Sequence, residues 1–172
     1  MGAGQQTHCT SRMLLRPLLD KDISSLFEFM SDAQAMRHTY IASSIEMCAA
    51  RLNTFETMRA RLGFAPWVVQ SATAGHVIGW GGLCVDPDQP EWGLEVVYAF
   101  SPDNWGHGYA TELVRYSLAY AFDQLAAPED HTLVATENVQ SIRVLQKCGF
   151  NMLRYEPSLV RNHYHVRAAS AA

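Results

Sequence analysis

The sequence predicts a mixed α/β layer fold in one domain, and three observations indicate this. A chain of 172 residues with 48% hydrophobic residues is suited to one sizeable core. Strand-like and helix-like patterns follow one another in the order β-α-α-β-β-β-α-β-α-β-β, with no repeat, linker or low-complexity tract. Residues 67–100 contain three strand-like runs separated by turns, which is typical of an antiparallel meander.

The first elements are a strand and a short helix. Residues 13–18 predict a strand that ends near Pro17. Asp20 or Asp22 is suited to begin the helix, because a carboxylate accepts hydrogen bonds from first-turn N–H groups. Apolar residues then recur at helical spacing: Ile23, Leu26, Phe27 and Met30.

A second helix is expected before residue 63. Ser43 and Glu46 have the spacing of a capping box, in which each side chain bonds the other residue's backbone N–H. Part of the apolar face is supplied by Leu52, Phe55 and Leu62. Gly63 is a plausible end of the helix, because glycine readily adopts the left-handed conformation of a helix C-terminus.

The meander begins with a hairpin. Its arms are residues 67–70 and 76–80, joined by a turn at 72–75, and the second arm continues to Val85. The Pro-rich and Asp-rich segment 86–90 predicts another turn, and residues 92–100 predict the third strand.

The second half of the chain alternates helix and strand. A long helix is expected from Thr111, with apolar residues at three- and four-residue steps, and Pro128 ends it. A strand over residues 131–136 and a helix over residues 141–147 follow, with Gly149 ending that helix. The last strands are expected at 151–155 and 162–167.

Composition narrows the class of protein. The net charge of −4 argues against nucleic acid as the main partner, because phosphate backbones require a basic surface. No apolar run approaches the length needed to span a bilayer, and residues 1–12 lack the apolar core of a signal peptide. The cysteines, Cys9, Cys48, Cys84 and Cys148, form no C-x-x-C pair, so we expect reduced thiols and a cytoplasmic protein. Residues 1–12 and 168–172 are expected to be loose.

The most informative segment is a glycine-rich turn between a strand and a helix. It reads Trp105-Gly106-His107-Gly108-Tyr109-Ala110. The unpaired N–H groups and the dipole at a helix N-terminus favour an anion, and glycine lets the backbone approach it closely. A dinucleotide fingerprint would require glycine or alanine at Thr111 and a parallel βαβ unit, and the Gly-Lys-Ser/Thr of a P-loop is absent. A tight turn without a ligand is the alternative.

With the loop in place, the chain resembles the GCN5-related N-acetyltransferase (GNAT) family. Residues 105–112 resemble its acetyl-CoA loop, and residues 136–150 resemble its second hallmark. The Trp-Gly-x-Gly-Tyr-Ala and Asn-x-x-Ser forms, with the opening residues 14–18, are similar to the RimJ/RimL-like branch. The likeness covers residues 13–167. It implies a single GNAT domain with a mostly antiparallel central sheet flanked by helices, and acetyl transfer from acetyl-CoA directly to a primary amine.

The resemblance also implies a cofactor site. The loop would hold the pyrophosphate of coenzyme A, mainly through backbone N–H groups, and the strand before it would pair with the pantetheine arm. One strand N–H would stabilise the oxyanion that develops on the thioester carbonyl. The residues implied here are Tyr98, Ala99, Phe100, Trp105, Gly106, His107, Gly108, Tyr109, Ala110 and Thr111.

The second motif adds further candidates. Asn138 would hydrogen-bond the pantetheine arm, or it caps a turn. Ser141 would lie near the sulfur and donate a proton or hydrogen bond to the leaving thiolate, or it caps a helix. Other branches use a tyrosine at the position of Leu145. Arg143 and Lys147 share a helix face and would reach the coenzyme phosphates, or they form a solvated face.

Glu95 is an acid within an apolar strand, so it should be exposed, paired or functional. The resemblance implies a general base that deprotonates the incoming amine through water, and an edge-strand glutamate facing solvent is the alternative. Val97 follows where this branch often has glycine, which crowds the cleft.

The acceptor amine is left open. A protein N-terminus, an aminoglycoside, a polyamine or an amino acid all remain candidates, and so does a non-catalytic acyl-CoA-binding module with the same fold. Segments 31–45 and 156–165 are expected to shape the acceptor pocket, with a wall made by Met36, His38, Tyr40, His163 and Tyr164. His163 and His165 share a strand face but lack further ligands, so no metal is expected. A monomer or homodimer is expected.

Overall fold

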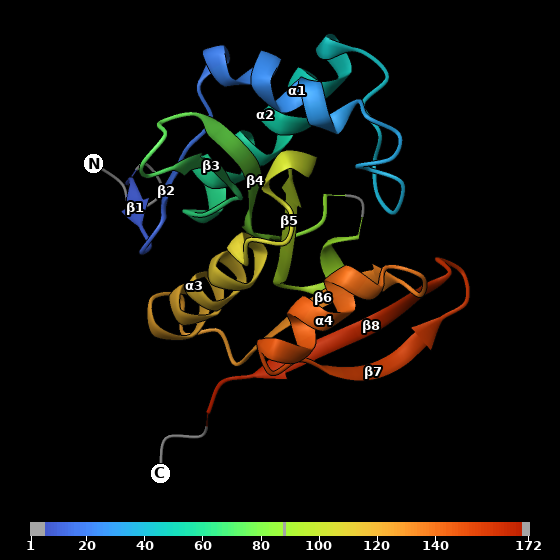
Figure 1. The fold of residues 1–172 in the computed structure, drawn as a ribbon. Helices are drawn as coiled ribbons and strands as arrows, with labels where there is room; N and C mark the ends of the chain where they lie inside the picture. The colour runs from blue at the N-terminus through green and yellow to red at the C-terminus, as the bar shows by residue number, and fades with distance from the viewer. Residues whose placement is uncertain (1–5, 88, 170–172) are drawn as a thin grey trace.

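The computed structural model describes residues 6–87 and 89–169 (Figure 1). Eight strands form one sheet in the order β1-β2-β3-β4-β5-β6-β8-β7. All neighbouring strands are antiparallel except β5 and β6, which are parallel. The mixed, mostly antiparallel sheet with flanking helices is therefore confirmed. The strands are β1 (His8–Cys9), β2 (Met13–Arg16), β3 (Trp67–Ser71), β4 (Val77–Cys84), β5 (Glu95–Phe100), β6 (Glu129–Ala135), β7 (Asn151–Glu156) and β8 (Arg161–Arg167).

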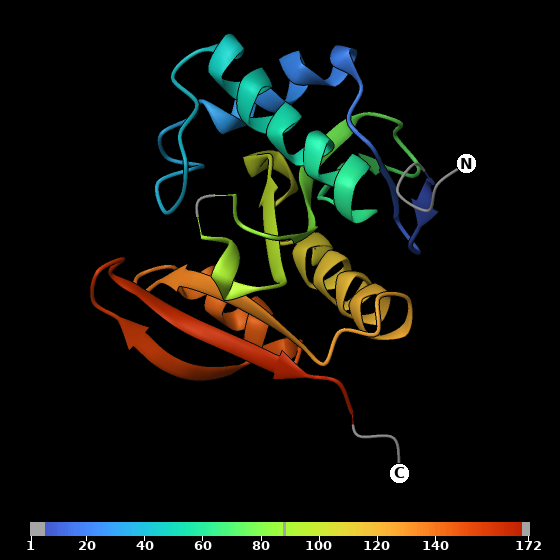
Figure 2. The ribbon, with the colours of Figure 1, turned by 180° about the vertical axis from the view of Figure 1, so that it is seen from behind.

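The helices cover both faces of the sheet. Helices α1 (Ile23–Met30) and α2 (Ile45–Leu62) lie together on one side, and α3 (Tyr109–Asp123) and α4 (Val139–Lys147) lie on the other (Figures 1 and 2). Strand β5 shows how the alternation of side chains serves both layers. Val96 packs with Val114 and Leu145 of α3 and α4, whereas Val97 packs near Phe55 of α2.

Strands β5 and β6 meet at a single position. Glu95 pairs with His131, and the His131 N–H donates to the Leu94 carbonyl at 3.0 Å. The remainder of each strand has no ladder partner across this gap among the residues that the structure describes. The sheet therefore splays open between β5 and β6, and backbone groups of both strands are available to a ligand.

Several predicted boundaries shift. Helix α2 begins after Ser44, whose hydroxyl accepts from the Met47 N–H at 3.2 Å, so the capping serine is one residue later than Ser43. Helices α3 and α4 each begin two residues earlier than expected, at Tyr109 and Val139. The strand expected from residue 92 begins at Glu95, because Pro90–Trp92 form a 3-10 turn.

Asp22 precedes α1 but does not cap it. Its carboxylate instead binds the Arg16 guanidinium with two contacts of 2.6 and 2.8 Å, and it accepts from the Leu19 N–H at 2.9 Å. The acid therefore links the end of β2 to the start of the helix. The charge-assisted hydrogen bonds to Arg16 engage the Asp22 carboxylate in place of the N–H groups at the helix terminus.

The expectation of a loose segment up to residue 12 is wrong for its second half. Residues 8 and 9 form β1, which pairs with β2, and the His8 ring packs 5.4 Å from the Trp67 ring. The Tyr116 hydroxyl lies 2.9 Å from His8 Nδ1. Residues 1–5 and 170–172 of the two predicted loose ends lie outside the described residues.

Candidate active site

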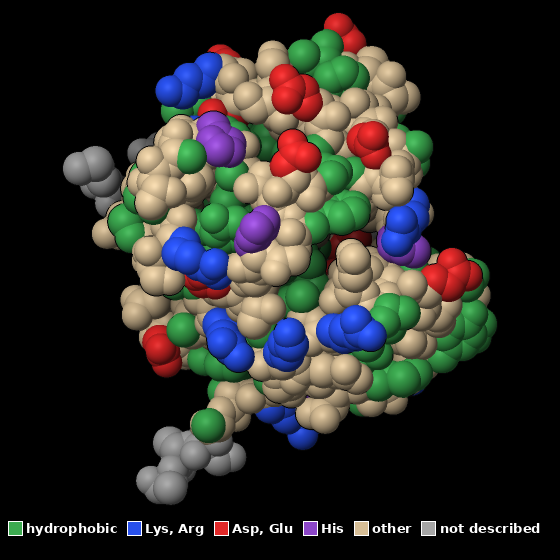
Figure 3. Space-filling view, in the orientation of Figure 1, with side chains coloured by type: hydrophobic (Ala, Val, Ile, Leu, Met, Phe, Trp, Pro, Cys, Tyr) green, Lys and Arg blue, Asp and Glu red, His purple; other side chains and the backbone are tan. Residues whose placement is uncertain are grey.

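A cleft of about 460 Å³ occupies the splay between β5 and β6, and we call it the splayed cleft. Its floor is formed by residues 96–100 and 132–135, and its rim by the glycine loop, the start of α4 and residues 34–39. Figure 3 shows the surface hollowed beside α4, with Lys and Arg side chains gathered along the rim over α3 and α4. Almost every residue predicted to bind the cofactor lines it: Tyr98, Ala99, Phe100, Trp105, Gly106, Gly108, Tyr109, Ala110, Thr111, Asn138, Ser141, Arg143 and Lys147.

The glycine loop has the backbone geometry of an anion cradle. Gly106 and Gly108 have φ angles of +77° and +81°, a region that residues with a Cβ rarely adopt. Gly108 is the N-cap of α3 and no side chain caps this terminus. The N–H groups of the first turn therefore lack intrahelical acceptors and are directed to the loop. The Trp105 indole N–H fixes the loop entrance by donating to the Phe100 carbonyl at 2.8 Å.

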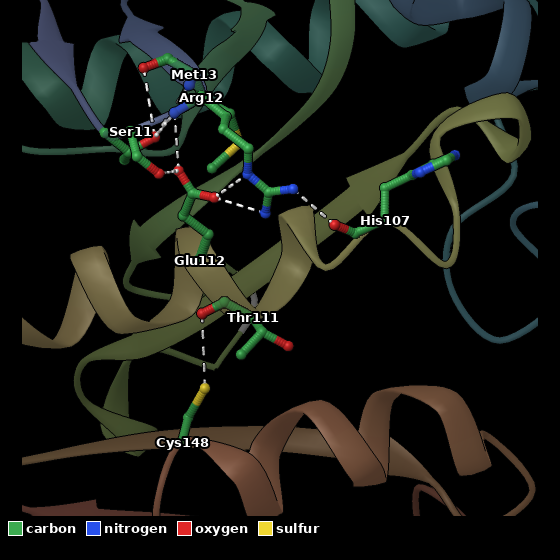
Figure 4. A network of polar contacts seen from close by, with 8 residues as sticks. Ser11, Arg12, Met13, His107, Thr111, Glu112 and Cys148 are labelled. Atoms are coloured by element: carbon green, nitrogen blue, oxygen red, sulfur yellow. Dashed lines mark hydrogen bonds and ion pairs between the residues drawn. The ribbon is translucent and has the colours of Figure 1, made fainter.

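His107 is the one predicted cofactor-binding residue that does not line the splayed cleft. Its carbonyl accepts from Arg12 Nη1 at 2.8 Å, as Figure 4 shows. The carboxylate of Glu112, in the first turn of α3, binds Arg12 Nε at 2.7 Å and the Ser11 hydroxyl at 2.8 Å. The guanidinium also lies 4.7 Å from the Tyr109 ring centre. The segment expected to be loose therefore braces the loop from outside.

Sequence reasoning missed this brace because Arg12 and Glu112 are one hundred positions apart. One sequence feature could have revealed it. Glu112 is a carboxylate in the first turn of a helix whose N-terminus is expected to bind an anion. Burial tends to raise the pKa of Glu112, but hydrogen bonds from Thr10, Ser11 and Arg12 lower it on balance. Glu112 is thus held as a carboxylate by its neighbours, and it is not among the residues that line the splayed cleft.

The N-terminus of α4 supplies the opposite wall. Asn138 is its N-cap, and the amide oxygen accepts from the Ser141 N–H at 3.1 Å. The capping interpretation of Asn138 therefore holds, and the residue lines the splayed cleft as well. Arg143 and Lys147 are exposed and also line the cleft, whereas Leu145 is fully buried in the core.

Tyr98 approaches Ser141 from the sheet. Its hydroxyl is buried without a hydrogen-bond partner among the described residues, although it lies within electrostatic reach of the Ser141 hydroxyl. Burial raises the pKa of Tyr98 to about 12, and the serine partly offsets this. Tyr98 and Ser141 line the cleft from different elements, β5 and α4, and a hydroxyl of this pair can serve as a proton donor.

Glu95 is buried in the middle of the sheet, with 6% of its surface exposed. The interpretation as a solvent-facing glutamate on an edge strand is therefore wrong, because β5 lies between β4 and β6. Its Oε1 atom has no hydrogen-bond partner among the described residues. Burial, and secondarily the charge of Asp86, raises the pKa of Glu95 to about 7. A carboxylate in this state can accept a proton near neutral pH.

Glu95 faces a second, smaller space that we call the side cavity. It has a volume of about 110 Å³ and lies between the sheet and the α1/α2 layer. Met36, Thr39, Val97, Tyr98 and Ala99 line both spaces, so the side cavity adjoins the splayed cleft. Val97, expected to crowd the cleft, is thus part of the shared wall. Strand β5 therefore contributes residues to both spaces.

Only some of the residues predicted for the acceptor wall line the two spaces. Met36 and Tyr40 line the side cavity, and His38 lines the splayed cleft. His163 and Tyr164 line neither: Tyr164 is in the core, and His163 packs 5.1 Å from the Trp92 ring centre. The side cavity further includes residues that sequence reasoning did not select: Met30, Cys48, Arg51, Leu52, Phe55, Trp80, Cys84 and Asp86. They come from separate segments that only the packing of α2 on the sheet brings together.

His163 instead joins a histidine pair behind the site. Its Nε2 lies 2.9 Å from His131 Nδ1. Within residues 6–87 and 89–169, no group of three or more His, Cys, Asp or Glu side chains has the arrangement of a metal site.

None of the described helices is long and apolar enough to cross a membrane.

Comparison with known proteins identifies the family. The acetyltransferase (GNAT) domain family matches residues 12–151. The uncharacterized N-acetyltransferase YoaA of Bacillus subtilis is 27% identical over 143 residues, which are 82% of this chain and 80% of YoaA. An acetyltransferase structure from Agrobacterium tumefaciens superposes with a TM-score of 0.82 at 22% identity, over 95% of each chain. Spermidine N-acetyltransferase from Vibrio cholerae, solved with CoA and spermine, gives a TM-score of 0.72 at 20% identity over 92% of this chain and 96% of its own. Because the family match spans most of the sequence, the chain belongs to the GNAT acetyltransferase family.

Proposed function

We propose that the protein is an acetyl-CoA-dependent N-acetyltransferase of the RimJ/RimL-like branch, which transfers the acetyl group directly to a primary amine in a ternary complex. The observation that carries this proposal is the splayed cleft, because the helix N-termini of α3 and α4 and the unpaired edges of β5 and β6 converge on it. The presence of CoA in the V. cholerae spermidine N-acetyltransferase structure supports the choice of co-substrate.

The residues of the cleft fit the chemistry of coenzyme A. The turn from Gly106 to Thr111 offers N–H groups and a helix dipole to the diphosphate. Arg143 and Lys147 offer positive charge at the rim for phosphate groups. The backbone of β5 from Tyr98 to Phe100 offers hydrogen bonds to the amides of the pantetheine arm, and Asn138 offers a side-chain amide.

In the proposed reaction, the amine nitrogen attacks the acetyl carbon of the thioester. A C–N bond forms, and the carbonyl π pair moves to oxygen, where a β5 N–H stabilises the negative charge. The C–S bond then breaks. Glu95 accepts, through water, the proton that the ammonium form of the acceptor must lose before attack. The nitrogen of the new amide releases one proton to water and the leaving thiolate gains one. Ser141, with Tyr98 as its neighbour, donates to the thiolate and regains a proton from water, so the step balances.

The experiment has two stages. Calorimetry with acetyl-CoA tests binding, and release of free thiol over a panel of amines tests transfer. We expect binding, thiol release with at least one amine, and a kcat for Ser141→Ala about tenfold or more below wild type. Binding without thiol release from any amine favours the non-catalytic module, and absence of binding refutes both functions.

A cytoplasmic location is part of the same proposal. All of the cysteines, Cys9, Cys48, Cys84 and Cys148, are free thiols. Their unpaired state supports a reducing compartment. Fractionation of cells that express the chain, followed by thiol labelling, tests this, and a disulfide-linked form would contradict it.

A further inference from the structure

The side cavity has walls of a particular chemistry. Its sides are apolar and aromatic, with the Phe55 and Trp80 rings packed edge to face at 5.1 Å. Its volume of about 110 Å³ is smaller than that of an engineered protein cavity of about 150 Å³ that binds benzene. The space therefore suits a compact apolar body. It cannot enclose a sugar ring system or an extended peptide.

A cation projects into this space from the helical layer. The Arg51 guanidinium lies 4.6 Å from the Tyr40 ring centre and 5.9 Å from that of Phe55, and Arg51 lines the cavity. Among the hydrogen bonds and ion pairs of the described residues, none involves this guanidinium, whose described contacts are with the two rings. An arginine fixed by aromatic faces, with its planar set of donors unused, is preorganised for a carboxylate.

An acid projects into the same space from the sheet. Glu95 is 6% exposed and its Oε1 has no hydrogen-bond partner among the described residues. Asp86, two residues after the end of β4, also lines the cavity. The helical layer thus presents a positive group and the sheet presents negative ones, with apolar walls between them. This distribution of charge is complementary to a molecule that carries both an ammonium and a carboxylate.

We propose that the acceptor is a free α-amino acid with a compact apolar side chain, whose carboxylate binds Arg51 and whose amine lies toward Glu95 and the shared wall of β5. This inference rests on the proposed acetyl transfer, and it selects one acceptor class among those that the sequence left open. Polyamines and aminoglycosides would bring a second ammonium close to Arg51. A peptide N-terminus would lack the adjacent carboxylate and would extend beyond the cavity.

The test compares valine with isobutylamine, which is valine without its carboxylate. Thiol release from acetyl-CoA is measured with both, and with spermidine, kanamycin and a Val-Gly-Gly peptide. We expect kcat/KM for valine to exceed that for isobutylamine by about tenfold or more, because a charge-assisted bidentate contact is lost in the amine. Arg51→Ala should lower kcat/KM for valine by about tenfold to a hundredfold, and should lower it much less for isobutylamine, which has no carboxylate to bind.

Two further variants sharpen the result. Arg51→Lys keeps the charge without the planar donors, so it should recover only part of the valine activity. Arg61→Ala removes an exposed arginine from the end of the same helix, outside both cavities, and should leave both amines unaffected. Thermal unfolding of each variant shows whether the fold is retained.

The outcomes separate this inference from the proposed function. Equal rates with valine and isobutylamine, an equal effect of Arg51→Ala on both, or a preference for spermidine, kanamycin or the peptide refutes the amino-acid acceptor and leaves acetyl transfer standing. If no amine releases thiol, acetyl transfer is refuted. Calorimetry of valine with the CoA-bound protein then tests whether the side cavity binds an amino acid. Binding that Arg51→Ala abolishes then supports the site, and absence of valine binding overturns it.

Discussion

At the scale of single residues, the chemistry depends on where Glu95 is placed. Its neighbours in sequence are apolar, and the sheet buries it between β4 and β6. Burial destabilises its charged form and raises its pKa to about 7. An exposed glutamate has a much lower pKa and is a weaker base near neutral pH.

The pH dependence of activity follows from this pKa. Glu95 accepts a proton only when it is deprotonated, so kcat/KM of the wild type should rise through about pH 7. Glu95→Gln should lower kcat by about a hundredfold and remove this rise. The remaining, more gradual increase in kcat/KM with pH would come from the growing fraction of neutral amine. Steady-state kinetics from pH 6 to 9 measure both effects. A variant with the wild-type profile would show that Glu95 is not the base.

The same substitution should stabilise the fold at high pH. The folded-state pKa of about 7 exceeds the usual 4.5, so the folded protein retains a proton that the unfolded chain has released. Stability therefore falls as pH rises between these values. The penalty is complete above about pH 7 and amounts to at most about 3 kcal/mol. Glu95→Gln should gain more stability over wild type at pH 8 than at pH 4.5 in urea unfolding; an equal gain at both would contradict the shift.

At the scale of elements, the glycine loop and α3 act with the N-terminal segment. Arg12 joins the Glu112 carboxylate to the His107 carbonyl, and so connects the residues just before β2 to the loop (Figure 4). Nearly half of the Arg12 side chain is exposed, so its ion pair contributes little to stability. Its expected role is to fix the loop geometry.

Arg12→Ala should therefore affect binding more than folding. We expect KM for acetyl-CoA to rise by about threefold to tenfold, with kcat retained, because the loop loses its external support. Kinetics with acetyl-CoA varied at a fixed amine measure this. Arg61→Ala, at an exposed arginine near the end of α2 that lines neither space, is the control. A fall in kcat without a change in KM would show that Arg12 does not act through the loop.

Gly108 offers a second test of the loop. Alanine there would have to adopt a φ of about +81°, and its Cβ would meet only Arg12 Nη2 at 3.6 Å. Gly63, with a φ of +84° and no atom within 4 Å, is a matched control at the end of α2. Both Gly→Ala variants should lose about 1 kcal/mol of stability from backbone strain. Only Gly108→Ala should also raise KM for acetyl-CoA. An equal KM for both variants would show that Gly108 takes no part in the cofactor site.

At the scale of the whole molecule, the sheet consists of two parts joined weakly at its centre. β5 and β6 share one paired position, and α3 and α4 pack together across the junction. A ligand in the splayed cleft contacts both parts, because residues 96–100 and 132–135 line it from opposite sides. Ligand binding is thus expected to stabilise the entire fold.

Coenzyme A at about one hundred times its Kd should add about 2.7 kcal/mol to the free energy of unfolding. For a chain of this length, that corresponds to a rise in Tm of about 5–10 °C. Differential scanning calorimetry measures it. The double variant Arg143→Ala with Lys147→Ala should show a smaller rise at the same concentration, and an unchanged Tm in the wild type would refute binding in the cleft.

The sequence by itself determined the order of the helices and strands from β2 onward, the glycine loop and the two motifs of the family, because these depend on local patterns of a few residues. Helix starts shifted by one or two positions, since capping depends on which side chain reaches the terminus. Only the tertiary structure decided that Glu95 is buried, that Arg12 braces the loop, and that Arg51 and Glu95 line the same side cavity. These relations join residues far apart in the chain, and they follow from how the helices pack on a splayed sheet.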